Sequence, residues 1–278
     1  FWRSQLMSAR IITGMGLLGL LIVALYFGGW VFSLLWIACV CIALYEIFRA
    51  LSKAGHRPVA WPTWAALIIA IPGFLYLRQV TSLLLLVSLI ALTLLIVSVL
   101  VMFRDQPKLE DLTMSVLPLF TVALRAMSFL GMTEVEPIGY QRVLLCLAFL
   151  IPVFGDSMAY FVGSKLGRTK LNEQISPKKT VEGAVAGLLG SVLAATGIYL
   201  AGLLFKVEMP AFIHFIVLGI LGGIASQIGD LLASFVKRHC GVKDFGTIFP
   251  GHGGMLDRLD SILFSGTLVY LYQALPWI

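Results

Sequence analysis

Apolar residues run along this chain in long blocks, and polar residues gather in short segments between them. Because the hydrocarbon core of a bilayer is about 30 Å thick, a helix needs about 20 apolar residues to cross it. The pattern therefore predicts an all-α polytopic membrane protein with about nine transmembrane helices. The predicted spans are residues 11–27, 30–50, 61–77, 81–103, 112–131, 140–163, 181–204, 211–236 and 254–275.

Composition supports a membrane protein and argues against a soluble domain. Of the 278 residues, 59% are hydrophobic and 12% are charged, and the mean hydropathy is +0.97, whereas soluble domains carry about 25% charged residues. The apolar blocks recur from end to end, so residues 1–278 are predicted to form one membrane unit without a linker. Within it, residues 1–135 are expected to be a scaffold and dimerisation half, and residues 136–278 a catalytic half.

The first predicted span resembles a signal peptide, because it follows Arg3 and Arg10. The block is long, however, and it ends without a small-residue cleavage site. We therefore expect a retained helix.

Lys and Arg are distributed unevenly along the chain, and cytoplasmic loops normally carry the excess. A cytoplasmic N-terminus puts sixteen of the 20 Lys and Arg residues inside, against Arg78, Arg142 and Lys206 outside. Nine spans then leave the C-terminus outside, and loops 164–180 and 237–253 face the cytoplasm, as in a bacterial inner membrane. The net charge of +6 thus reflects topology and is no sign of nucleic-acid binding. The inside residues are Arg3, Arg10, Arg49, Lys53, Arg57, Arg104, Lys108, Lys165, Arg168, Lys170, Lys178, Lys179, Lys237, Arg238, Lys243 and Arg258.

Carboxylates in the last predicted spans indicate a metal site. An ionised side chain inside a membrane is costly and usually faces a cavity or a partner. Asp230 shares a helix face with Gln227 and Ser234, and Asp257 and Asp260 are three residues apart at a helix start. Carboxylate oxygens suit Mg²⁺, which takes few protein carboxylates and completes its shell with water and phosphates. We predict that Asp230, Asp257 and Asp260 bind this metal.

Asp156, in the sixth predicted span, is a further candidate for contact with substrate or metal. For this residue a structural role in packing, or a place in an ion pathway, stays open as an alternative. The other three aspartates share one membrane level and basic surroundings, which favours a site.

The cytosolic loop 164–180 combines cations with the start of a helix. Its stretch SPKKTVEG, residues 176–183, has the composition of a helix start, and helix N-termini bind phosphate. Lys178 and Lys179 adjoin this start and are predicted to contact phosphate. The other cations of the loop are equally explained as positive-inside charges.

The stretch PGHGGMLDRLD, residues 250–260, repeats this arrangement. Gly253 and Gly254 allow the backbone to approach a ligand closely, and the following helix start carries Arg258. His252 is predicted to contact phosphate or to assist proton transfer, and a merely solvated loop histidine is the alternative.

Residues 234–260, SFVKRHCGVKDFGTIFPGHGGMLDRLD, resemble the signature of phosphatidate cytidylyltransferases, also called CDP-diglyceride synthetases. Every fixed position of that signature is filled. The SPKKTVEG loop and the GD and AY pairs of the sixth span are also similar to the family, so the resemblance covers roughly the C-terminal half. The filled positions are Ser234, Lys237, Arg238, Lys243, Asp244, His252, Gly253, Gly254, Asp257, Arg258 and Asp260.

The resemblance implies an integral membrane enzyme, a homodimer, that converts CTP and phosphatidic acid into CDP-diacylglycerol and pyrophosphate with Mg²⁺. A potassium ion is also associated with such sites. Taken together, the predicted catalytic residues are Asp230, Lys237, His252, Asp257, Arg258 and Asp260, and the predicted substrate-binding residues are Asp156, Lys178, Lys179, Ser234, Arg238, Lys243, Asp244, Gly253 and Gly254.

Two other functions stay open. Another CTP-dependent lipid phosphotransferase, such as a polyprenol or phytol kinase, would use the same type of site and release CDP. A cation transporter would also need intramembrane carboxylates, but transporters more often show broken helices in both halves, whereas the polar residues here crowd into the last spans. Arg125, in the fifth span, has no predicted role.

Overall fold

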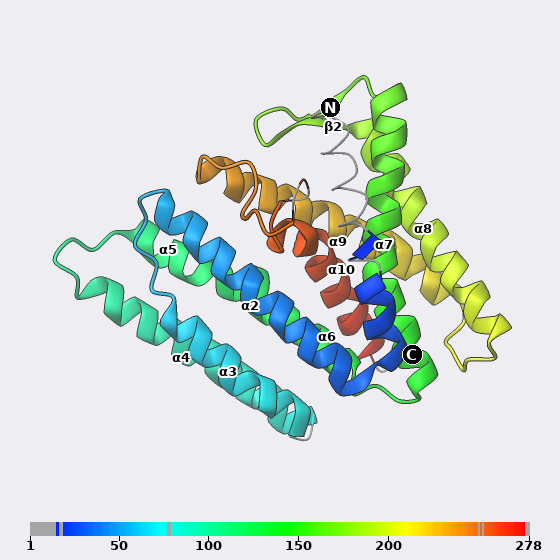
Figure 1. Cartoon of the computed structure of the whole chain (residues 1–278), viewed down its shortest axis with the longest axis horizontal. Helices are drawn as coiled ribbons and strands as arrows, with labels where there is room; N and C mark the ends of the chain where they lie inside the picture. The colour runs from blue at the N-terminus through cyan, green and yellow to red at the C-terminus, as the bar shows by residue number, and fades with distance from the viewer. Residues whose placement is uncertain (1–14, 17–18, 77–78, 250, 252, 276–278) are drawn as a thin grey trace.

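The computed structural model describes residues 15–16, 19–76, 79–249, 251 and 253–275. Its helices are α2 (Gly29–Lys53), α3 (Trp61–Tyr76), α4 (Gln79–Met102), α5 (Leu109–Pro118), the π-helical turn η1 (Leu119–Ala123), α6 (Leu124–Met132), α7 (Ile138–Leu166), α8 (Val181–Leu204), α9 (Phe212–His239) and α10 (Leu256–Gln273). Figure 1 shows α3 and α4 at one edge, α7 and α8 at the opposite edge, and α2, α6 and α10 between them.

A helical membrane protein is confirmed, because six helices of the described chain are long and apolar enough to cross a bilayer. These helices are Gly29–Lys53, Leu84–Met102, Leu109–Met132, Ile138–Leu166, Val181–Leu204 and Phe212–His239. Trp61–Gly73 is a shorter apolar helix, and residues 11–14, 17 and 18 of the first predicted span lie outside the described residues. The prediction of nine spans is therefore met only in part.

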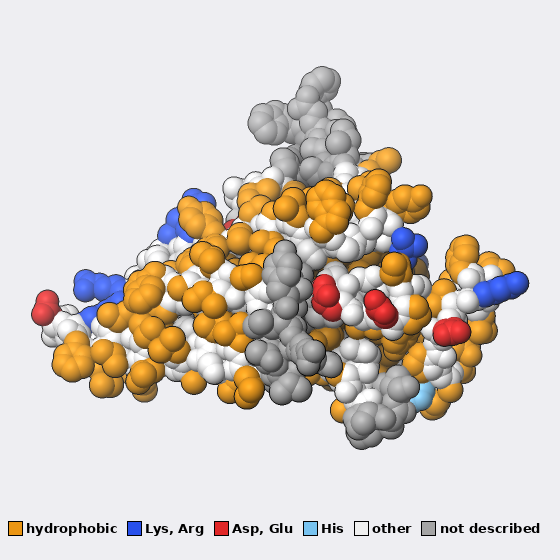
Figure 2. Space-filling view, turned by 90° about the horizontal axis from the view of Figure 1, so that it is seen from below, with side chains coloured by type: hydrophobic (Ala, Val, Ile, Leu, Met, Phe, Trp, Pro, Cys, Tyr) orange, Lys and Arg blue, Asp and Glu red, His pale blue; other side chains and the backbone are white. Residues whose placement is uncertain are grey.

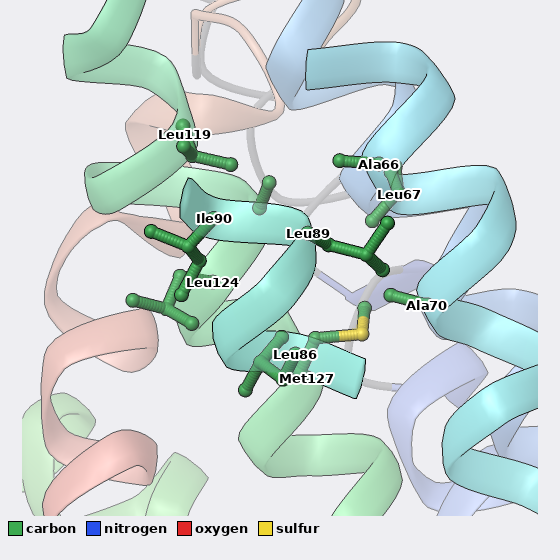
Figure 3. Close-up of a pocket in the computed structure, with 10 residues that line it drawn as sticks. Ala66, Leu67, Ala70, Leu86, Leu89, Ile90, Leu119, Leu124 and Met127 are labelled. Carbon is green, nitrogen blue, oxygen red and sulfur yellow. The ribbon is translucent and has the colours of Figure 1, made fainter. Parts of the chain in front are cut away.

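Hydrophobic side chains cover most of the face seen from below, with few charged groups among them (Figure 2). This is the surface expected of helices that contact lipid. A small cavity lies between α3, α4, η1 and α6 (Figure 3). Only hydrophobic residues line it, so its lining contains no side chain suited to catalysis. Its lining residues are Ala66, Leu67, Ala70, Leu86, Leu89, Ile90, Leu119, Ala123, Leu124 and Met127.

Glycines bring α7, α8 and α9 close together. A Cβ atom placed on Gly155 of α7 would lie 2.6 Å from Ser191 Oγ of α8, and one on Gly219 of α9 would lie 2.7 Å from the Cα of Val192. Small residues allow such close approach between membrane helices. Because Asp156 follows Gly155 directly, this crossing positions its carboxylate near α8 and α9.

Loop 164–180 contains a short β-hairpin, which the all-α prediction did not include. Strand β1 (Lys170–Asn172) pairs antiparallel with β2 (Ser176–Thr180). The side chain of Asn172 accepts hydrogen bonds from the Gln174 and Ile175 amides, each at 3.1 Å, and so closes the turn.

The helix start predicted for the stretch SPKKTVEG is confirmed, and the residues before it form strand β2. Helix α8 begins at Val181, where Thr180 Oγ1 accepts a hydrogen bond from the Gly183 amide at 3.1 Å. Pro177 fits the extended backbone before the helix, because the residue before a proline is restricted to extended backbone. Lys178 and Lys179 therefore lie on a strand that leads into the helix.

Candidate active site

A polar cavity of about 640 Å³ lies where the hairpin meets α7, α8 and α9. Its size is typical of pockets that bind small molecules. Lysines from the hairpin and carboxylates from the helices lie together in its lining, whereas most helix surfaces of the protein are apolar. The lining residues are Asp156, Ala159, Tyr160, Gly163, Ser164, Lys170, Leu171, Lys178, Lys179, Thr180, Gly183, Ala184, Gln227 and Asp230.

The three lysines of the cavity differ in their partners. Lys179 forms an ion pair with Asp230 of α9, and Lys170 donates a hydrogen bond to the Pro177 carbonyl at 2.6 Å. Lys178 is exposed, and its ammonium group has no hydrogen-bond or ion-pair partner within the described residues. The hairpin therefore presents at least one uncommitted cation to an incoming anion.

Three carboxylates lie close enough for their charges to interact: Asp156, Asp230 and Asp260. Asp260 is buried, and its Oδ1 accepts hydrogen bonds from the Ser261 amide at 2.7 Å and the Ser261 hydroxyl at 3.2 Å. Asp156 also lies near that hydroxyl and is exposed toward the cavity. Helices α7, α9 and α10 thus contribute one acid each to the same region.

These three carboxylates can bind a divalent cation only if phosphate groups of a bound molecule complete its coordination. In the described part of the chain, no three His, Cys, Asp or Glu side chains converge as a preformed metal cluster. Mg²⁺ needs only one or two protein carboxylates when phosphates complete its shell. Asp230 and Asp260 fit that requirement, since they are hard oxygen donors beside a cavity with room for phosphates.

Asp257 occupies a different environment from the one predicted. Its Oδ1 pairs with Lys237 Nζ at 2.8 Å, and its Oδ2 accepts hydrogen bonds from the Phe245 amide at 2.8 Å and the Gly254 amide at 3.0 Å. The side chain is only 3% exposed. In this conformation Asp257 holds the loop between α9 and α10 in place, and Lys237 neutralises it.

The glycines of this loop approach protein carboxylates closely. Gly253 has φ of +81°, and a Cβ atom there would lie 3.0 Å from Asp257 Oδ2. A Cβ atom on Gly254 would lie 2.5 Å from both carboxylate oxygens of Glu46. Only glycine fits these two positions, so the signature glycines are explained by the packing of the loop as well as by any ligand.

Glu46 of α2 was missed by the sequence analysis. Its buried carboxylate accepts hydrogen bonds from the Met255 amide at 3.1 Å and the Leu256 amide at 2.8 Å, and so caps α10. A negative charge at a helix N-terminus is stabilising. The available signal was a lone acid inside the predicted span 30–50, which usually indicates a buried partner.

We expect Glu46→Ala to destabilise the protein by about 3 kcal/mol, because two buried amides lose a charged acceptor. Glu46→Gln retains one acceptor oxygen, so its stability should lie between that of Glu46→Ala and that of the wild type. Thermal unfolding in detergent would measure both, with Glu134→Ala, an exposed acid outside the site, as the control. An unchanged melting temperature in Glu46→Ala would contradict this role.

None of the remaining predicted residues that the structure describes lines the cavity. Arg238 Nε donates to the Ile175 carbonyl at 3.4 Å and so links α9 to the hairpin. Ser234 is half-buried one turn after Asp230. Lys243, Asp244 and Arg258 are exposed, and His252 lies outside the described residues.

Other residues of the cavity were not predicted as ligands. Tyr160 and Ser164 follow Asp156 at helical spacing on α7, and Lys170 belongs to the hairpin. Gln227 precedes Asp230 by about one turn, and its amide donates to the Ala184 carbonyl at 2.9 Å. The spacing from the two aspartates was the available signal for the helical residues, because positions three or four apart share a helix face.

Comparisons with known proteins identify the family of the chain. Residues 8–275 match the model of the cytidylyltransferase family. The chain is 34% identical to a phosphatidate cytidylyltransferase of Synechocystis sp., over 96% of this chain and 97% of the relative. It is 44% identical to one of Bacillus subtilis over 43% of each chain, and 30% identical to chloroplastic phosphatidate cytidylyltransferase 5 of Arabidopsis thaliana over 89% of this chain and 67% of the relative. The chain therefore belongs to the cytidylyltransferase family.

Proposed function

We propose that this protein is a nucleotidyltransferase that transfers the cytidylyl group of CTP to phosphatidic acid, giving CDP-diacylglycerol and pyrophosphate for phospholipid biosynthesis. The observation that carries the proposal is the polar cavity, in which the hairpin lysines face the carboxylates of α7 and α9. Membership of the family and the names of the relatives agree with it.

The lysines of the cavity are proposed to bind the triphosphate. Lys178 is exposed at the cavity and contacts the phosphates directly in this proposal. Lys179 joins it after leaving Asp230, its partner in the structure. Cations held in place before the reaction stabilise the charge that develops on the leaving pyrophosphate, which is the main task of a protein in phosphoryl and nucleotidyl transfer.

Asp230 and Asp260 are proposed to hold Mg²⁺, with Asp156 as a neighbouring ligand of the metal or its waters. When bound, Mg²⁺ neutralises the phosphates and polarises their oxygens. Asp257 keeps the signature loop and Lys237 in position beside this centre. The potassium ion implied by the resemblance stays a prediction.

The nucleophile is a phosphate oxygen of phosphatidic acid, which is already ionised near neutral pH. A bond forms between that oxygen and the α-phosphorus of CTP, and the bond from the α-phosphorus to the bridging oxygen breaks. Pyrophosphate leaves with the electron pair. Because the nucleophile carries its own charge, the protein needs no strong general base, and its residues act by orientation and charge neutralisation.

The membrane arrangement proposed with this reaction has nine spans, a cytoplasmic N-terminus and an external C-terminus in a bacterial inner membrane. Loops 164–180 and 237–253 then meet CTP and Mg²⁺ in the cytoplasm, which agrees with their excess of Lys and Arg. Residues 1–135 are proposed to support the catalytic half and to form the homodimer contact.

The proposal is tested with purified protein in lipid, supplied with CTP, phosphatidic acid and Mg²⁺. We expect CDP-diacylglycerol and pyrophosphate in equal amounts by mass spectrometry, and no product with EDTA. Formation of CDP with a phosphorylated lipid would show a kinase instead. If only another lipid acceptor reacted, the named substrate would have to be abandoned.

A further inference from the structure

Arg125 of α6 is a half-buried cation for which the reaction above gives no reason. Its guanidinium carbon lies 3.6 Å from the centre of the Phe264 ring on α10. Its Nε is buried and has no hydrogen-bond partner within the described residues. An arginine inside a membrane helix is costly and is usually retained for a function. Here its observed partner is the face of an aromatic ring, which attracts a cation electrostatically.

The direction of Arg125 depends on the π-helical turn that precedes it. The span Leu109–Met132 contains η1 at Leu119–Ala123, two residues before Arg125. Such turns are rare and occur frequently at functional sites. One extra residue in a turn rotates all later side chains by about 100° around the helix axis. Without the extra residue of η1, Arg125 would be turned by about 100° around the helix axis from the position in which it contacts Phe264.

Phe264 connects Arg125 to the proposed metal site. It follows Asp260 by one turn of α10, and its ring packs on α9 at Gly229, the residue before Asp230. A Cβ atom on Gly229 would lie 2.7 Å from the Asp260 carbonyl oxygen and 2.8 Å from Phe264 Cδ2. The contact of Phe264 with Gly229 is therefore part of the crossing that sets the distance between Asp230 and Asp260.

We infer that Arg125 is a positioning residue for the Asp230 and Asp260 carboxylates and acts through Phe264. Its guanidinium lies against the Phe264 ring while that ring packs on Gly229. Loss of the cation frees the ring, loosens the crossing of α9 and α10, and changes the separation of the two carboxylates. Arg125 is absent from the lining of the polar cavity, so it need not contact the nucleotide. The inference rests on the proposed function, because it assigns these carboxylates to the metal.

The test compares Arg125→Met, Arg125→Lys, Phe264→Leu and the double variant Arg125→Met/Phe264→Leu. We expect Arg125→Met to raise the half-saturating Mg²⁺ concentration by about tenfold, with a much smaller change in KM for CTP at saturating metal. Arg125→Lys retains a cation for the ring and should restore most of the affinity. Adding Arg125→Met to Phe264→Leu should not raise the half-saturating Mg²⁺ concentration further, because the two substitutions remove the same interaction.

Mn²⁺ binding in the presence of CTP but without phosphatidic acid, followed by electron paramagnetic resonance, provides a readout that does not depend on turnover. Arg142→Met serves as the control, because Arg142 is exposed and donates to the Tyr26 carbonyl, outside the contact of Arg125 with Phe264. If Arg125→Met fails to fold, the comparison of Arg125→Lys with Phe264→Leu still tests the inference. Arg125→Lys should keep most of the metal affinity, and Phe264→Leu should lose it. Additive effects, or equal Mn²⁺ affinity in every variant, would overturn the inference.

The outcome also separates the two proposals. If the wild type makes CDP-diacylglycerol and all variants keep its metal dependence, the inference fails and the proposed function stands. If the wild type makes no CDP-diacylglycerol but the variants weaken Mn²⁺ binding in the coupled manner described, the proposed function fails and the positioning role stands.

Discussion

Asp230→Asn is expected to lower turnover by about a thousandfold while the protein remains folded. Asp230 is the carboxylate that both lines the polar cavity and pairs with a hairpin lysine, Lys179. Asparagine has the same shape but no charge, so the metal loses a ligand. The side chain is 26% exposed, which makes a large loss of stability unexpected.

The measurement is turnover with CTP and phosphatidic acid over a range of Mg²⁺ concentrations, together with the melting temperature. Asp105→Asn is a matched control, because Asp105 is exposed in the connection between α4 and α5 and lies outside the cavity lining. A variant that keeps most of the wild-type turnover would remove Asp230 from the metal site.

Asp257→Asn is expected to reduce both stability and turnover. The substitution leaves Lys237, whose side chain is 13% exposed, without its counter-charge, and it disturbs the acceptor of the Phe245 and Gly254 amides. Breaking a buried ion pair by removing one partner costs about 3–5 kcal/mol. The loop between α9 and α10 should loosen, and turnover should fall with it.

The double variant Asp257→Asn/Lys237→Met distinguishes structure from chemistry. It removes the uncompensated charge, so the melting temperature should recover largely. Turnover should stay low, because the cation of Lys237 beside the proposed metal centre is lost. Recovery of turnover as well would assign the pair a purely structural role. An unchanged melting temperature in Asp257→Asn alone would contradict the importance of the pair for stability.

Much of the candidate site could be located from the sequence, but its partners could not. The position of Asp230 one turn after Gln227, on a polar helix face, follows from helical spacing alone. The predicted metal site grouped Asp230 and Asp260 with Asp257, whereas in the structure Asp257 is surrounded by Lys237 and two loop amides. Asp156, from another helix, lies near Asp230 and Asp260 instead.

The sequence by itself determined the class of the protein and its family. Blocks of about 20 apolar residues cannot be buried in a small soluble core and satisfy their backbone only as membrane helices. The spacing of the polar residues between 234 and 260 is a local property of the chain, so it is readable without a structure. The N-cap at Thr180 can also be predicted from neighbouring residues of the chain.

Only the tertiary structure decided which side chains meet. Glu46 caps α10 from 209 and 210 residues away in the chain, and Lys179 reaches Asp230 from a hairpin that composition did not indicate. Arg125 contacts the ring of Phe264 from the helix that follows η1. Such contacts depend on how helices cross and rotate, and hydrophobic periodicity constrains neither the partner of a helix nor the turn at which two helices touch.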